Sequence, residues 1–129
     1  MKKFDNFISA LQNLKDIYRY DEPYDNVVLT GLVALYEICF EQSWKAIKEV
    51  MEANGVRESA TGSPRQIIKA AYQMNMICDE ETWLKALQSR NNVTHAYNSE
   101  IALDIVRETK EIYYEMFCGL KKEIEENWL

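Results

Sequence analysis

One short segment, residues 89–99, holds the side chains of this sequence that are best suited to chemistry on a phosphodiester. It reads S-R-N-N-V-T-H-A-Y-N-S and contains the only histidine of the chain. Arg90 supplies a permanent cation that can bind a phosphate, and His95 supplies an imidazole, the group that transfers protons most readily near neutral pH. Tyr97 adds a phenolic hydroxyl. Together these residues predict a site that binds or acts on phosphodiesters.

The spacing of these residues predicts how they would lie on a helix. At about 100° per residue, Arg90 and Tyr97 share one face, whereas His95 lies about 140° around from Arg90. Arg90 and His95 therefore converge only if the arginine reaches around the helix or the helix bends. Asn91 precedes His95 by four residues and would lie beneath the imidazole, where it could orient the ring. The alternative is a polar helix end in which His95 has only a structural role.

Five helical segments are expected to position this site. Apolar residues recur at steps of three and four, as in helices with one buried face, and Asp25 or Asn26, Ser63 and Asp79 are suited to cap helix N-termini. The expected helices cover residues 2–19 and 26–54, a short stretch after Ser63, a stretch after Asp79, and a final stretch from Asn98 or Ser99 towards Ile124. This pattern predicts an all-α fold, an up-and-down bundle of four main helices plus one short helix, in a single domain over residues 1–129.

Three residues within these helices, and one connection, carry specific expectations. Gly31, inside the second helix, costs on the order of 1 kcal/mol relative to alanine, which suggests that another helix approaches it closely. Asn91 and Asn92 weaken the fourth helix and allow it to bend. Residues 56–62 are expected to form a flexible connection.

The composition limits the classes of function. A net charge of −6 argues against binding of nucleic acid over a broad basic surface, since such binding depends on neutralising phosphates, and it leaves only a local contact around Arg90. Three cysteines without a C-x-x-C pair and a single histidine predict no disulfide and no zinc site. No glycine-rich phosphate loop is present, so no metal or cofactor is expected. Without a signal peptide or a long apolar span, the protein is expected to be soluble and cytoplasmic.

The arrangement Arg90, four residues, His95, one residue, Tyr97 resembles the R-x4-H-x-Y motif of the HepT toxins, which belong to the HEPN superfamily of small helical ribonucleases. Further short motifs resemble the family of nucleotidyltransferase substrate-binding proteins in the same superfamily. These motifs are Gly31, Phe40-Glu41, Trp44-Lys45, Ser63-Pro64-Arg65, Trp83-Leu84 and Arg90-Asn91. The resemblance spans roughly residues 4–120 and implies a HEPN-like helical bundle.

The resemblance also implies a function. It implies a metal-independent ribonuclease toxin that binds RNA as a transient substrate and is paired with a minimal nucleotidyltransferase antitoxin. In this interpretation Arg90 stabilises the charge on the phosphorane, His95 transfers protons and Asn91 orients the imidazole of His95. Tyr97 is the residue that the family's antitoxin adenylylates, which would place bulk and negative charge in the cleft.

A homodimer is expected from the residues and is also implied by the resemblance. Cleavage of RNA through its 2′-hydroxyl needs both a base and an acid, but each chain has a single histidine. Two copies of the segment that face each other across a two-fold axis would supply two His95 imidazoles and two Arg90 guanidiniums in one cleft.

Two other functions remain open from the sequence. The chain lacks the G-S-x10-D-x-D type of motif of a nucleotidyltransferase, so it is not the transferase itself. It is compatible with a non-catalytic subunit that presents substrate to a separate nucleotidyltransferase. The acidic composition favours this alternative, whereas Arg90, His95 and Tyr97 favour the ribonuclease. A purely structural helical dimer is the third alternative.

Overall fold

The computed structural model describes residues 1–56 and 62–129, and within these ranges every regular element is a helix. The elements are α1 (Lys2–Leu14), η1 (Lys15–Arg19), α2 (Asn26–Ala53), α3 (Pro64–Gln73), α4 (Glu80–Asn92), η3 (Val93–His95), α5 (Ser99–Glu108), η4 (Thr109–Tyr113) and α6 (Tyr114–Asn127). Of these, η1 and η3 are 3-10 helices and η4 is a π-helical turn. The predicted all-α fold is confirmed.

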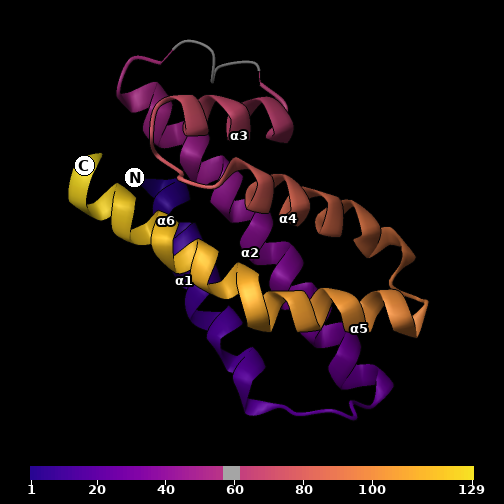
Figure 1. Cartoon of the computed structure of the whole chain (residues 1–129). Helices are drawn as coiled ribbons and strands as arrows, with labels where there is room; N and C mark the ends of the chain where they lie inside the picture. The colour runs from indigo at the N-terminus through magenta and orange to yellow at the C-terminus, as the bar shows by residue number, and fades with distance from the viewer. Residues whose placement is uncertain (57–61) are drawn as a thin grey trace.

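The long helix α2 runs through the centre of the bundle (Figure 1). It contacts α1, α3, α4 and α5, and α1 also packs on α6. Both chain ends lie near the second half of α2, because the amide of Lys3 donates to Glu49 at 2.9 Å and Asn54 donates to the carbonyl of Trp128 at 3.4 Å. The four main helices are α1, α2, α4 and the α5–α6 helix, and α3 is the short one.

Side chains at the helix starts explain where the helices begin. Asp25 accepts a hydrogen bond from the amide of Val28 at 2.8 Å. Ser63 and Gln66 form a reciprocal capping box ahead of α3, and Asp79 caps α4. Each of these contacts satisfies an amide that the first turn of a helix leaves unpaired. The caps predicted from the sequence are therefore present.

The final helix is continuous from Ser99 to Asn127 and contains the π-helical turn η4. Thr109, at the start of this turn, is buried and donates its hydroxyl to the carbonyl of Ile105 at 2.7 Å. Such bonds back to the preceding turn bend helices, and a π turn shifts the side chains that follow it. The sequence predicts the helix correctly but not the irregular turn within it.

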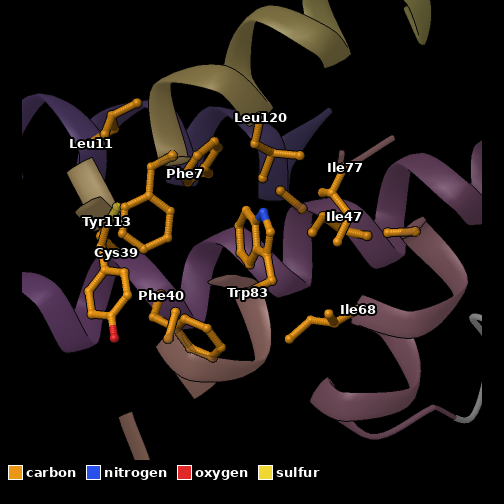
Figure 2. Close-up of a cluster of buried hydrophobic side chains, with 14 of the residues drawn as sticks. Phe7, Leu11, Cys39, Phe40, Ile47, Ile68, Ile77, Trp83, Tyr113 and Leu120 are labelled. Carbon is orange, nitrogen blue, oxygen red and sulfur yellow. The ribbon is translucent and has the colours of Figure 1, made fainter. Parts of the chain in front are cut away.

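A cluster of aromatic side chains forms the centre of the core. Phe117 makes edge-on contacts with Phe7, at 6.1 Å between ring centroids, and with Trp83, at 5.7 Å. Tyr36 stacks on Tyr113 at 5.2 Å. Figure 2 shows Trp83 in the middle of this core, where it anchors α4 against side chains of other helices. Because Trp83 is fixed in this way, the C-terminal part of α4 has a defined position.

Gly31 departs from the expectation. It lies on an exposed face of α2, and no atom of the described chain outside its own helix backbone comes within 4 Å of the position that a Cβ would take. The prediction that another helix of the same chain approaches Gly31 closely is therefore wrong.

Three further findings concern the remaining expectations. The flexible connection predicted over residues 56–62 falls mostly on residues 57–61, which lie outside the described residues. Cys39, Cys78 and Cys118 are free thiols. Among the described helices, none combines the length and the apolar character that a bilayer span needs.

Replacement of Phe117 by alanine tests the importance of the aromatic cluster. The side chain is fully buried, so Phe117→Ala removes apolar burial and leaves a cavity, and we expect the free energy of unfolding to fall by about 3–5 kcal/mol in urea denaturation. The control is Leu129→Ala, because Leu129 is 71% exposed and its truncation should cost less than about 0.5 kcal/mol. Equal losses in the two variants would contradict the packing described here.

Candidate functional site

The segment that carries the candidate site begins in a rigid helix and ends in a turn. Helix α4 stops at Asn92, and the 3-10 helix η3 and a turn lead to α5. Asn98 caps α5 by accepting a hydrogen bond from the amide of Glu100 at 2.9 Å. The helix therefore ends at the asparagine pair where the sequence predicts a weak point. As a result, the regular helical spacing does not relate Arg90 to His95 or Tyr97.

Arg90 is held against the central helix. Its Nε forms an ion pair with the carboxylate of Glu41 on α2, and its guanidinium carbon lies 5.9 Å from the centroid of the Phe40 ring. The Nη1 atom donates to Oδ1 of Asn91 at 3.0 Å. Arg90 is thus partly buried, and its direction is set by residues of two helices.

Glu41 is the residue of this site that sequence reasoning missed. One carboxylate oxygen binds Arg90, and the other accepts a hydrogen bond from Nε1 of Trp44 at 3.1 Å. Burial raises the pKa of Glu41, but the hydrogen bonds from Arg90 and Trp44, with the charges of Arg90 and Lys45, outweigh it and lower the pKa overall. The carboxylate therefore stays ionised. The signal in the sequence was the Phe40-Glu41 and Trp44-Lys45 motifs, which the sequence interpretation did not connect to Arg90.

Asn91 makes a different contact from the one expected. Its side-chain oxygen accepts from Arg90, and its carbonyl accepts from the hydroxyl of Thr94 at 3.2 Å. The spacing that would place Asn91 beneath the His95 ring assumes a continuous α-helix, and the 3-10 turn of η3 replaces that helix. The orienting role of Asn91 towards His95 stays a prediction, whereas its contact with Arg90 is observed.

His95 and Tyr97 project into solvent. Val93 and Ala96, on the same turn, pack on the apolar cluster formed by α2, α5 and η1. The rings of His95 and Tyr97 lie edge to face with 6.3 Å between their centroids. Tyr97 is 88% exposed, and neither side chain makes a hydrogen bond within the described part of the molecule. Both groups are therefore accessible to a partner or a substrate.

A polar cluster with two buried hydroxyls fixes α4 one residue before Arg90. The hydroxyls of Ser89 and Tyr113 lie 2.7 Å apart, and Tyr113 donates to Oε2 of Glu108 at 2.9 Å. Lys85 forms an ion pair with the other oxygen of Glu108 at 3.4 Å. Burial raises the pKa of Tyr113; the hydrogen bond from Ser89 lowers it, but the bond to Glu108 raises it further. Tyr113 therefore remains a neutral donor that ties α4 to the π-helical turn.

The chemistry available in one copy of the chain follows from this geometry. It offers an exposed imidazole, an exposed phenol, and a guanidinium that is already paired with a carboxylate. Arg90 and His95 are not in contact in the observed arrangement, so the structure brings together Arg90, Asn91 and Glu41 on one side and His95 and Tyr97 on the other. In the described residues no group of three histidine, cysteine or acidic side chains is placed to hold a metal ion.

Comparison with known families decides the relationship of this chain. The sequence pattern of the family described as nucleotidyltransferase substrate binding protein like matches residues 2–126. The chain belongs to this family. No curated protein matches the sequence.

Two solved structures have a fold similar to that of this chain. The protein ttk003001694 from Thermus thermophilus is 23% identical, with a TM-score of 0.82 over 93% of this chain and 99% of that one. HI0074 from Haemophilus influenzae is 16% identical, with a TM-score of 0.79 over 95% of this chain and 99% of that one. HI0074 is described as showing the fold of a substrate binding domain of a nucleotidyltransferase. At these identities the similarity establishes a shared helical fold.

Replacement of Glu41 by glutamine should reduce stability more at neutral pH than at acidic pH. The folded-state pKa of Glu41 lies below its ordinary value of 4.5, so its stabilising effect is fully present above about pH 4.5 and is lost as the pH falls through the lower folded-state value. We expect Glu41→Gln to lower the free energy of unfolding by about 1 kcal/mol at pH 7 and by much less at about pH 3, as measured by urea denaturation.

The matched control is Glu126→Gln, which removes an exposed carboxylate that has no ion pair in the described chain. Its effect should stay within about 0.5 kcal/mol at both pH values. A loss for Glu41→Gln that is the same at pH 7 and pH 3 would contradict the role assigned to the ionised carboxylate.

Proposed function

We propose that this chain is the substrate-binding companion of a separate nucleotidyltransferase. The observation that carries the proposal is the family match over residues 2–126, which covers nearly the whole chain. The fold shared with HI0074, whose structure is described as that of a nucleotidyltransferase substrate binding domain, supports the same role. A heteromeric complex with the transferase is therefore the expected working form.

The exposed turn after α4 is the part of the molecule best suited to meet the transferase. Tyr97 is 88% exposed, and the turn that carries it is anchored by Val93 and Ala96 beneath. We propose that Tyr97 is itself adenylylated. Its hydroxyl oxygen would attack the α-phosphorus of ATP, form the new phosphate ester, lose its proton to solvent or a base, and release pyrophosphate.

Incubation with the transferase tests this proposal directly. The chain is mixed with a minimal nucleotidyltransferase, ATP and magnesium, and complex formation is followed by size-exclusion chromatography and modification by intact mass. We expect a stable complex and adenylyl-sized mass increments that vanish in Tyr97→Phe, since only an exposed phenol can align with the α-phosphate.

The control for this experiment is Tyr72→Phe, which removes another exposed tyrosine and should leave the increments unchanged. A complex that forms without modification would support the companion role and contradict the adenylylation of Tyr97. The absence of both a complex and a modification would contradict the proposed function.

A ribonuclease of the HEPN type is the second candidate. The observation that favours it is the exposed His95 beside Tyr97, on the turn that follows the partly buried Arg90. In the reaction, a 2′-hydroxyl of RNA attacks the adjacent phosphorus and gives a 2′,3′-cyclic phosphate. One imidazole accepts the hydroxyl proton and a second protonates the departing 5′-oxygen. RNA is a transient substrate in this mechanism, and no metal takes part.

This reaction needs a homodimer, because one chain supplies one imidazole. An unpartnered face of α2 supports such a dimer. Val27, Gly31 and Ile38 return to one side of the helix; Val27 and Ile38 are 81% and 52% exposed, and the space at Gly31 is open. The close approach that Gly31 suggests would then come from a second copy, and the same face continues towards Glu41 and Arg90.

Expression of the chain without a transferase tests the ribonuclease. We expect RNA degradation that falls at least about 100-fold in His95→Ala, which is the lower range for loss of a general acid or base, and wild-type protein that sediments as a dimer at micromolar concentration. The control is Thr94→Ala, an exposed neighbour in the same turn, which should retain activity.

Equal RNA degradation by wild type and His95→Ala would contradict the role of His95. A monomer in sedimentation, or no RNA degradation by the wild type, would contradict this second function and leave the companion role as the only one of the two.

A further inference from the structure

A second group of polar side chains lies on α2 near Glu41 and has no part in the functions above. These side chains surround a cavity of about 350 Å³, which is lined by Lys3, Trp44, Lys45, Lys48, Glu49 and Glu52. We term Lys3, Trp44, Lys45 and Lys48 the lysine–tryptophan groove. Its volume falls within the range of about 300–1,000 Å³ that is usual for ligand sites, and all four side chains are half-buried.

Helical spacing and one capping contact bring these side chains together. Trp44 and Lys48 are one turn apart on α2, and Lys45 lies beside them on the same face. Lys3 joins the groove from the start of α1, because the backbone amides of Lys3 and Phe4 donate to Oε1 of Glu49 at 2.9 and 3.3 Å. No pattern in the sequence connects Lys3 to Lys48, so the groove exists only in the folded chain.

The three lysines form a local excess of positive charge on an acidic protein. None of Lys3, Lys45 and Lys48 takes part in an ion pair with any residue that the structure describes. Of the two carboxylates in the lining, Glu49 is bonded to backbone amides and Glu52 is exposed. With three lysines and two carboxylates, the lining carries one net positive charge, so an anion bound beside the lysines would gain favourable electrostatic interactions.

Side-chain contacts link the groove to the site around Arg90. Trp44 lines the groove and donates from Nε1 to Glu41 at 3.1 Å, and Glu41 binds Arg90 through its other oxygen. From Glu41 to Lys48 the distance along α2 is about 10 Å. Phosphates bound at the lysines would therefore lie close to Glu41, whose carboxylate stands between the groove and the guanidinium of Arg90.

We infer that the lysine–tryptophan groove binds a single-stranded polynucleotide, with phosphates on Lys45 and Lys48 and a base against Trp44. Basic grooves lined with an aromatic side chain are the common way in which proteins hold single strands. The inference rests on the proposed substrate-binding role and deepens it by naming the substrate class. A free nucleotide offers the same phosphate and base chemistry, and the experiment separates the two ligands.

Binding of fluorescein-labelled hexauridylate, followed by fluorescence anisotropy at several salt concentrations, tests the inference. We expect Lys45→Glu/Lys48→Glu to weaken binding at least tenfold and to reduce the slope of log K against log salt by about 1.4, since each phosphate contact to a single strand contributes about 0.7. The matched control is Lys121→Glu/Lys122→Glu, which makes the same charge change beside another cavity, lined also by Lys15, and should weaken binding less than twofold. Trp44→Phe should remove the quenching of tryptophan fluorescence by the unlabelled strand.

Circular dichroism establishes that each variant is folded, and Lys45→Gln/Lys48→Gln replaces the charge reversal if that variant unfolds. Equal weakening by the two charge reversals, or no binding by the wild type, would overturn the inference. If ATP displaces the labelled strand at the same concentration as unlabelled hexauridylate does, the groove is a mononucleotide site and the inference of a polynucleotide ligand is overturned. The variant Lys45→Glu/Lys48→Glu keeps Tyr97, so its adenylylation by the transferase tests the companion role independently of the groove. If the variant is adenylylated while the wild type does not bind hexauridylate, the groove inference fails and the companion role stands.

Discussion

The ion pair between Glu41 on α2 and Arg90 on α4 is the contact through which the core sets the position of the candidate site. Helix α4 is bound to the bundle along its length, by Trp83 in the aromatic cluster, by the carbonyl of Ala86 that accepts from Tyr36, and finally by Arg90. Two residues after Arg90 the helix ends. The site therefore has a fixed half, held by Glu41, and an accessible half on the following turn.

This division has a chemical consequence for both proposed functions. The guanidinium of Arg90 already binds a carboxylate and lies over an aromatic ring, so it has little freedom. An incoming phosphate must therefore either share Arg90 with Glu41 or displace the Glu41 carboxylate. Pre-organised charges of this kind stabilise an anion without the cost of reordering the side chain. His95 and Tyr97, in contrast, depend on a second molecule for their partners, which is a transferase in the first function and a second copy of the chain in the other.

The central helix α2 unites the features that lie outside this segment. Its exposed apolar face at Val27, Gly31 and Ile38 leads towards Glu41, and the lysine–tryptophan groove begins one turn beyond Glu41. The lining of this groove carries three lysines and two carboxylates, so it is locally positive by one charge on an acidic protein, and electrostatic binding depends on such local charge because screening limits the reach of distant carboxylates. The acidic composition argues against a broad basic surface, but it does not describe this local groove.

The sequence by itself determined the helices, their caps and the residues that bear chemistry. Apolar periodicity and side chains such as Asp25, Ser63 and Asp79 act within a few residues, so the helix starts and the all-α class follow from local physics. The weak point at Asn91-Asn92 was predicted for the same reason. Arg90, His95 and Tyr97 were identified from their chemistry and spacing, although the regular helix assumed for that spacing ends at Asn92.

Only the tertiary structure decided which of these side chains meet. The pairing of Arg90 with Glu41, 49 residues away, the placement of Lys3 beside α2, and the π-helical turn at Tyr113 all depend on how helices pack against one another. Packing is a property of whole helix faces, and the sequence carries no local signal for the partner that a given side chain will find. For this reason the sequence predicted the fold and the reactive residues, whereas the folded chain alone showed that Arg90 is paired, that Tyr97 is exposed, and that none of the described helices covers Gly31.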